Sequence, residues 1–403
     1  MTKIKTTINK LMFARSISFF GSSFSDFVLP LFIYEMTKSP ILIGLQWTVI
    51  ALSKIIAGKI SGRFHIGKTN KHALLILDLC QAISTLIPLV FWNYNPALGT
   101  FISGFLIAFC ITLQAGYIES TVVHLSDSTE DANNTRTWIN ANLDKGKNIG
   151  LFLGYLVAWL TATYAGYKVA IAIDSLSFLV SALVTYTVHD DSIHELKNKV
   201  KASYSYLFQT KTISYLTISQ ALLSFSIFIF NAGFIYTMKH EFNSPNGAIA
   251  ALLIFQSLLY IVGSSLASKF NLKNLDHHVY FRFLYVLIFL GFSISTNYYH
   301  FILFNALLSL LISFTQPRII SIFQSFSNPT NSRSMGSARA SLMAVSGSIG
   351  SVLCGYLLSI YSFKVPFLFA TLSAFICSVL FLLMTKSLNL NKHLTTEENT
   401  NVF

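Results

Sequence analysis

Long apolar runs separated by short polar stretches make up most of the chain. Each run is long enough to cross a hydrocarbon layer as a helix, which takes about 20 residues. Because backbone polar groups in lipid must bond to one another, and no run alternates with a period of two, the pattern predicts an all-α integral membrane fold. The twelve predicted transmembrane helices cover residues 11–34, 41–62, 73–94, 98–122, 139–162, 167–188, 213–237, 247–268, 279–296, 299–323, 338–360 and 364–385.

Composition supports a lipid-facing surface. Hydrophobic residues make up 53% of the chain and charged residues 11%, and the mean hydropathy is +0.59. A soluble domain carries about 25% charged residues, because it needs a wetted surface. The composition therefore excludes a soluble enzyme and makes membrane lipids the surroundings of most of the surface.

Basic residues alternate from loop to loop. If both termini are cytoplasmic, most of the 28 Lys and Arg residues lie on the inner side. The outer loops then hold only Lys38, Lys168, Lys239 and Lys364. This asymmetry follows the positive-inside rule and predicts a multi-pass protein of a bacterial inner membrane with both termini cytoplasmic. The net charge of +12 is explained by orientation, so we expect no nucleic-acid partner.

The two halves of the chain repeat one another. Residues 149–156 (IGLFLGYL) recur as residues 349–357 (IGSVLCGYL) with one residue inserted, and 114–118 pairs with 316–320. The matches occur in the same order at nearly constant offsets, which predicts two parallel six-helix repeats with the substrate site between them. The predicted units are an N-terminal bundle (1–189), a cytoplasmic linker (190–212), a C-terminal bundle (213–385) and a cytoplasmic tail (386–403).

Several segments resemble one family. Residues 15–18, 25–27 and 29–40 resemble the first helix and outer loop of a major facilitator superfamily branch that contains macrolide-efflux and enterobactin-exporter proteins. Residues 174–183 (DSLSFLVSAL) resemble its sixth-helix signature, and Arg333 with Gly336 resembles its last inner loop. The resemblance implies the major facilitator fold and export of an antibiotic, a siderophore or a small peptide-like natural product.

Two motifs depart from the superfamily pattern. The loop after the second helix keeps Gly58 and Arg63 but has Gly62 where the family has an acid, which removes one partner of the usual inner gate. The fifth helix resembles the antiporter motif through its small residues, with Tyr155 in place of proline. The predicted gating residues are Lys54, Arg63, Gly146, Gly150 and Gly154. Small residues at every fourth position allow close helix packing, either static or sliding where the halves meet.

Ionisable residues inside predicted helices are costly and mark functional positions. All such acids lie in the N-terminal half, and the acids after residue 212 fall in loops or the tail. We therefore predict that protons couple through the N-terminal half, at Asp26, Asp78 and Glu119. Asp26 is the first choice, roughly 12 Å from the outer face by helical rise. The alternative is a structural carboxylate that caps a neighbouring helix.

Other charged residues allow more than one interpretation. Lys54 and Asp78 lie at similar depths on adjacent helices, which suggests an ion pair, either structural or gating. Glu119 and Asp144 are either solvated or gate-forming near the inner face. Asp174 is either a packing and hydrogen-bonding residue or a substrate contact. Arg15 either snorkels to the interface or binds substrate.

Polar side chains on several helices could bind a solute. The predicted substrate-binding residues are Arg15, Gln114, Asn231 and Gln316, and helix–helix hydrogen bonding is the alternative for the last three. The chain holds 36 Phe and 18 Tyr, which could supply apolar cavity walls. It has no phosphate-binding loop and no metal-ligand spacing, so we expect no cofactor and no metal.

These features together predict a secondary active transporter and not an enzyme. The expected activity is export of an antibiotic, siderophore or peptide-like product by proton antiport, which would confer resistance or self-immunity. Its partners would be the small-molecule or peptide substrate, protons and lipids, and its working unit a monomer. The alternatives are a proton-coupled importer on the same fold, a polytopic membrane enzyme, or a transporter-like sensor.

Overall fold

The computed structural model describes residues 2–37, 40–61, 66, 69–127, 129–187, 204–270, 275–327 and 331–400. The described residues form helices and connecting turns, without strands. The first half holds α1 (Thr2–Thr37), α2 (Pro40–Ile60), α3 (Asn70–Thr85), α4 (Ile87–Val90), α5 (Pro96–Asp127), α6 (Ala132–Tyr164) and α7 (Tyr167–Tyr186). The second holds η1 (Tyr204–Phe208), α8 (Lys211–Tyr236), η2 (Thr237–Glu241), α9 (Asn246–Lys269), α10 (Leu275–Ile294), α11 (Tyr298–Ser325), α12 (Ser332–Ile360) and α13 (Lys364–Thr400).

The predicted runs match these helices closely, and the all-α membrane fold is confirmed. The third run is divided at Leu86, where Pro88 follows in α4. The fifth begins at Ala132, one to two turns before the predicted start. Within the described part of the chain, ten spans are long and apolar enough to cross a membrane; α2 and α6 are not among them. The predicted total of twelve requires that α2 and α6 also cross the membrane, and this stays a prediction.

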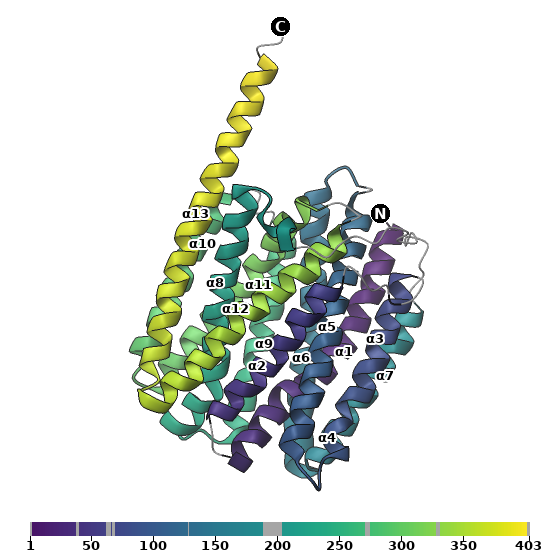
Figure 1. Cartoon of the computed structure of the whole chain (residues 1–403), viewed down its shortest axis with the longest axis vertical. Helices are drawn as coiled ribbons and strands as arrows, with labels where there is room; N and C mark the ends of the chain where they lie inside the picture. The colour runs from purple at the N-terminus through teal and green to yellow at the C-terminus, as the bar shows by residue number, and fades with distance from the viewer. Residues whose placement is uncertain are drawn as a thin grey trace.

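The helices form two groups that repeat the same packing. In Figure 1, α1–α7 lie on one side of the bundle and α8–α13 on the other. In the first group α1 packs against α6 and α7, and α3 packs against α7. In the second, α8 packs against α12 and α13, and α10 packs against α13. The two sets of contacts correspond helix by helix, as the sequence repeat predicts.

The halves meet along two related helix pairs. Helix α2 packs against α12, and α6 packs against α9. Both chain termini lie at one end of the bundle (Figure 1), which we call the terminal end. There α5 also contacts α12, and α6 contacts α11. Gly58 and Gly116 permit this approach, because a Cβ at either position would overlap Ser341 or Ser337 of α12.

The glycine face of α6 lies elsewhere. A Cβ at Gly146 would overlap Met12, one at Gly150 the Ser16 carbonyl oxygen, and one at Gly154 the Ser23 hydroxyl, all on α1. Helices α1 and α6 belong to the same half, so the interpretation of this face as a sliding surface between the halves is corrected. The observed arrangement is close packing of α6 on α1 within one half, because small residues let two backbones touch.

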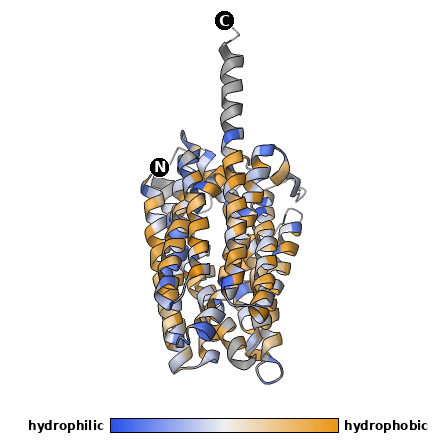
Figure 2. Ribbon diagram, turned by 90° about the vertical axis from the view of Figure 1, so that its left-hand side faces the viewer, coloured by the Kyte–Doolittle hydropathy of each residue, from blue (hydrophilic) through white to orange (hydrophobic). Residues whose placement is uncertain are grey.

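Apolar residues cover the outside and fill the second half. Hydrophobic residues dominate the helices between the two ends of the bundle (Figure 2). The C-terminal half is built around four phenylalanines at most 2% exposed, with ring centroids 4.8 to 6.4 Å apart: Phe230, Phe292, Phe301 and Phe367. Such tilted and stacked contacts make a tightly packed core.

The predicted domain limits stay predictions. Residues 188–203, most of the predicted linker, lie outside the described residues. The rest of that segment forms η1 and the start of α8. The predicted tail begins at residue 386, whereas α13 continues to Thr400.

Candidate functional site

Two cavities lie between the halves and share part of their lining. The first has a volume of about 390 Å³, and the second about 260 Å³. Both are lined by Asp144 and Lys147 of α6, Ile320 of α11 and Arg339 of α12. The larger cavity adds polar residues of the second half, Gln220, Ser224, Tyr260, Ser313 and Gln316. A solute in this space would contact both halves at once.

A phenylalanine between two cations stands in the wall of the smaller cavity. The Arg15 guanidinium lies 5.0 Å from the Phe19 ring centroid, and the Lys147 ammonium lies 5.3 Å from the same centroid. All three residues line the cavity. Ammonium and guanidinium groups are attracted to a ring face at this distance. The three side chains therefore form one cationic and aromatic surface from α1 and α6.

Arg15 also begins a buried hydrogen-bond chain. Its Nη1 donates to Gln114 Oε1 at 2.7 Å, and Gln114 Nε2 donates to Asp78 Oδ1 at 2.7 Å. Asp78 is 2% exposed, and its Oδ2 accepts from the Ser181 hydroxyl at 2.9 Å. The chain joins α1, α5, α3 and α7. The structure thus brings together three predicted site residues, Arg15, Gln114 and Asp78, within one half.

The predicted Lys54–Asp78 pair is wrong. Asp78 has its hydrogen-bond partners on α5 and α7, whereas Lys54 interacts electrostatically with Asp26. The two residues have similar depths by residue count, but α2 packs against α12 and α5 while α3 packs against α7 and α5. The two side chains therefore leave their helices in different directions.

Asp26 shares a helix face with the cavity-lining residues of α1. It follows Phe19 by 7 residues and Arg15 by 11, which are about two and three turns. Its side chain is exposed, and its carboxylate interacts electrostatically with the ammonium groups of Lys54 and Lys147. The predicted coupling acid therefore has electrostatic partners on two other helices, α2 and α6.

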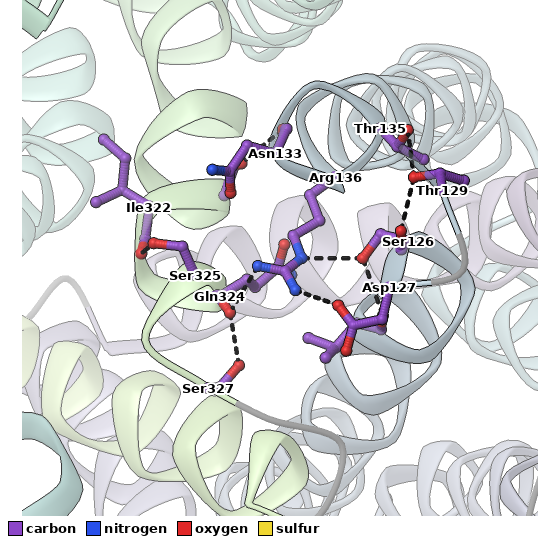
Figure 3. A network of polar contacts seen from close by, with 12 residues as sticks. Ser126, Asp127, Thr129, Asn133, Thr135, Arg136, Ile322, Gln324, Ser325 and Ser327 are labelled. Carbon is purple, nitrogen blue, oxygen red and sulfur yellow. Dashed lines mark hydrogen bonds and ion pairs between the residues drawn. The ribbon is translucent and has the colours of Figure 1, made fainter. Parts of the chain in front are cut away.

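A polar network joins the halves at the terminal end. Arg136 of α6 donates from Nε to the Ser126 hydroxyl at 2.9 Å and from Nη1 to the Gln324 carbonyl oxygen of α11 at 3.0 Å. It also forms an ion pair with Asp127 of α5 (Figure 3). Gln324 lies in the last turn of α11, where a guanidinium is favoured by the unsatisfied carbonyls.

Further bonds close the same end. Asn140 Nδ2 donates to Gln324 Oε1 at 2.8 Å, and the Ser321 hydroxyl donates to the Asn133 carbonyl oxygen at 3.0 Å. Arg339 Nη2 of α12 donates to Glu119 Oε2 of α5 at 2.7 Å. Within the described residues, these contacts and Arg136 connect α5 and α6 with α11 and α12. We call them the terminal-end lock.

Glu119 occupies a confined place in this lock. It is 5% exposed on its side chain, and a Cβ at Gly336 would lie 2.9 Å from its carboxyl carbon. Its observed partner is Arg339 of α12, so Glu119 takes part in a contact between the halves. Glu119 therefore both lines the smaller cavity and belongs to the terminal-end lock.

Of the remaining predicted residues, one lines a cavity. Gln316 lines the larger cavity, while Asn231 of α8 is half-buried and lines neither. Arg63 lies outside the described residues. Sequence reasoning did not select Lys147 or Tyr260 for the substrate site. The spacing of Asn140, Asp144 and Lys147 on one face of α6 could have indicated the first of these.

The comparisons with known proteins agree with this architecture. Residues 216–401 match the family described as Major Facilitator Superfamily. A bacterial homologue of the iron transporter ferroportin in an outward-facing state superposes with a TM-score of 0.75 at 14% identity, covering 94% of this chain and 99% of that one. The chain has the major facilitator fold. The predicted superfamily is thereby supported, and the exporter branch stays a prediction.

Other solved structures share the fold at similar distance. The human organic anion transporter MFSD10 has a TM-score of 0.73 at 12% identity, covering 94% of this chain and 99% of that one. FucP in an outward conformation has a TM-score of 0.71 at 13% identity, covering 95% and 99%. No curated relative matches the chain. At these identities the similarity concerns the fold alone.

Proposed function

We propose that the protein is a secondary active transporter that exports an amphipathic antibiotic, siderophore or peptide-like product in exchange for protons. The observation that carries this proposal is the pair of cavities between two six-helix halves, lined by charged and polar residues from both. Transporters with parallel repeats bind substrate at this place and expose it alternately to the two sides. The working unit proposed is the monomer.

The chemistry of the cavities suits an amphipathic solute. Arg15, Lys147 and Asp144 supply charge, and Phe19 and Phe228 supply apolar walls. Sites for small molecules combine a largely apolar lining with a few placed polar groups. The mixture here favours a solute with both an aromatic or aliphatic body and polar groups.

The proposed transport direction rests on the terminal-end lock, and the proposed proton coupling rests on Asp26. With both termini in the cytoplasm of a bacterial cell, as the basic loops predict, the lock closes the inner side. Opening that side requires the bonds of Glu119 and Arg136 across the halves to break. Asp26 would take up the proton, and its protonation would remove the negative charge that interacts with Lys54 and Lys147.

The test is efflux from energised cells that carry the wild type or Asp26→Asn. A panel of macrolides, catecholate siderophores and peptide antibiotics is loaded, and loss of label is followed with and without a protonophore. We expect export that the protonophore abolishes and that Asp26→Asn reduces at least about tenfold, as loss of a coupling proton site should. The control is Glu241→Gln. It also removes a carboxylate, but Glu241 lines neither large cavity and pairs, among the described residues, with its neighbour His240, so export should stay unchanged.

Protonophore-insensitive export would contradict proton antiport. Energised accumulation in place of efflux would show an importer on the same fold. If Asp26→Asn exports at the wild-type rate while the protonophore still inhibits, the coupling site lies elsewhere.

A further inference from the structure

A separate small cavity lies inside the N-terminal half. Its volume is about 10 Å³, which approaches the space that one water or one small ion needs. Helices α1, α3, α4, α5 and α7 contribute to its wall, and it shares no lining residue with the two large cavities. Its polar lining residues are Ser25, Thr85, Ser103 and Asp174.

Asp174 has one carboxylate oxygen that the protein leaves unsatisfied. The residue is 2% exposed, and its Oδ2 accepts from the Ser25 hydroxyl at 2.7 Å. Its Oδ1 is buried with no hydrogen-bond partner, and no basic side chain among the described residues pairs with it. A buried carboxylate without a compensating group is strongly destabilising, so an isolated charge here needs neutralisation.

A second buried oxygen in the same wall is also unsatisfied. Ser103 of α5 is 1% exposed, and its hydroxyl has no hydrogen-bond partner. Protonation of Asp174 alone would leave this hydroxyl as it is, and a proton on Oδ1 would find no acceptor. A cation in the cavity that both residues line would give each of them a partner, because carboxylate and hydroxyl oxygens both have lone pairs to offer.

The backbone next to the cavity is interrupted. Helix α3 ends at Thr85 and α4 begins at Ile87, with Pro88 at its second residue. Proline donates no backbone N–H, so the carbonyls of the preceding turn are not all bonded as in a continuous helix. Interrupted helices of membrane transporters present such carbonyls to bound cations. Thr85 and Pro88 both line the cavity.

We propose that Asp174, Ser25, Ser103 and the interrupted turn at Thr85 bind one sodium ion. The donors are all oxygen, which suits a hard cation. A single carboxylate balances a single positive charge, and the cavity is too small for a hydrated divalent ion. Gly21 leaves the carboxylate its space, since a Cβ there would lie 2.6 Å from Oδ1.

The site touches the proposed transport machinery through one peptide link. Ser25, which bonds Asp174, directly precedes Asp26, and the carboxylates of Asp26 and Asp174 interact electrostatically. A sodium ion on Asp174 would reduce the repulsion between these two like charges. This consequence for coupling rests on the proposed function, whereas the binding of sodium does not.

The test measures sodium binding by the purified full-length chain without any substrate. Saturable binding of ²²Na⁺ and the midpoint of thermal unfolding are followed in NaCl against choline chloride at constant ionic strength. We expect the wild type to bind one sodium per chain and to unfold at a higher temperature as sodium rises. Asp174→Asn should lose binding, and Ser103→Ala should raise the sodium concentration at half-saturation at least about tenfold.

The Ser103→Ala variant protects the test against misfolding. Its hydroxyl has no partner, so the variant should unfold like the wild type in choline chloride. Ser257→Ala is the matched control, because that hydroxyl is equally buried but donates to the Leu253 carbonyl oxygen in its own helix. It should bind sodium normally.

The outcomes separate this site from the transport proposal. No saturable ²²Na⁺ binding by the wild type, or unchanged binding by Ser103→Ala, would overturn the sodium site and leave a water as its occupant. Export would then still be open to its own test. Saturable sodium binding in a chain that exports nothing would support the site and refute the proposed transport.

Discussion

The ion pair between Glu119 and Arg339 should control which side of the bundle is closed. It joins α5 of one half to α12 of the other at 2.7 Å, on side chains 5% and 19% exposed. Glu119→Gln keeps the shape of the side chain and an oxygen that can accept from Arg339. The substitution therefore removes the charge of the pair with little change in packing.

The size of the effect follows from the hydrogen bond that is weakened. A hydrogen bond to a charged group contributes about 1.5 to 3 kcal/mol and a neutral one about 0.5 to 1.5 kcal/mol. Exchanging a charged acceptor for a neutral one therefore costs about 1 to 2 kcal/mol. No larger penalty adds to this, because Arg339 lines the cavities, where water can hydrate its guanidinium. This shifts the ratio of open to closed terminal ends by roughly 5- to 30-fold.

The assay is the distance between spin labels on the two halves at the terminal end. Labels at Glu130→Cys and Ser325→Cys use exposed positions on opposite halves. Of the four native cysteines only Cys80 is exposed, so Cys80→Ser gives a clean background. Double electron–electron resonance should show a longer-distance population that grows when Glu119→Gln is added.

Glu241→Gln is the control for this experiment, since it neutralises a carboxylate that takes no part in the terminal-end lock. It should leave the distance distribution of the labelled wild type unchanged. An unaltered distribution in Glu119→Gln would refute the reasoning, because the pair would then contribute nothing to the closed state.

Two further predictions concern stability and use thermal unfolding of the purified protein. Gly150→Ala should destabilise by about 1 to 3 kcal/mol, because its Cβ would overlap the Ser16 carbonyl oxygen, whereas Gly104→Ala, with 3.5 Å to the nearest atom, should be neutral or stabilising. Equal unfolding of the two variants would contradict the close packing of α1 and α6. Asp78→Ala should cost roughly 2 to 4 kcal/mol by leaving Gln114 without its acceptor, and Asp78→Asn clearly less, because an amide keeps an acceptor. A similar loss for both would show that charge, not hydrogen bonding, holds this position.

The sequence predicts the elements of this fold well because lipid imposes one simple rule on them. A span must be apolar, about 20 residues long and helical, and each condition is visible in the chain. Even the break before Pro88 is consistent with the loss of a backbone donor. The repeat of 149–156 at 349–357 likewise predicts the matching contacts of α1 with α6 and of α8 with α12.

Side-chain partners could not be predicted in the same way. Depth follows from counting residues, but the direction around each helix depends on how the helices rotate as they pack. Lys54 and Asp78 agree in depth and differ in direction, so their pairing failed. The glycine face of α6 was correctly predicted to touch another helix, yet nothing local indicates that the helix is α1 and not one from the other half.

The distribution of charge assigns different tasks to the halves. The C-terminal half packs a phenylalanine core around Phe230 and offers the lock an arginine, Arg339, and a backbone carbonyl, that of Gln324. The carboxylate of the interhalf ion pair comes from the N-terminal half. Arg339 also lines both large cavities, so the group that closes the terminal end is one that a bound solute can reach. If the cavities bind the substrate as proposed, an anionic group on it would compete with Glu119 for Arg339 and weaken the lock. Binding in the cavity would then favour opening of the terminal end directly, through Arg339 itself.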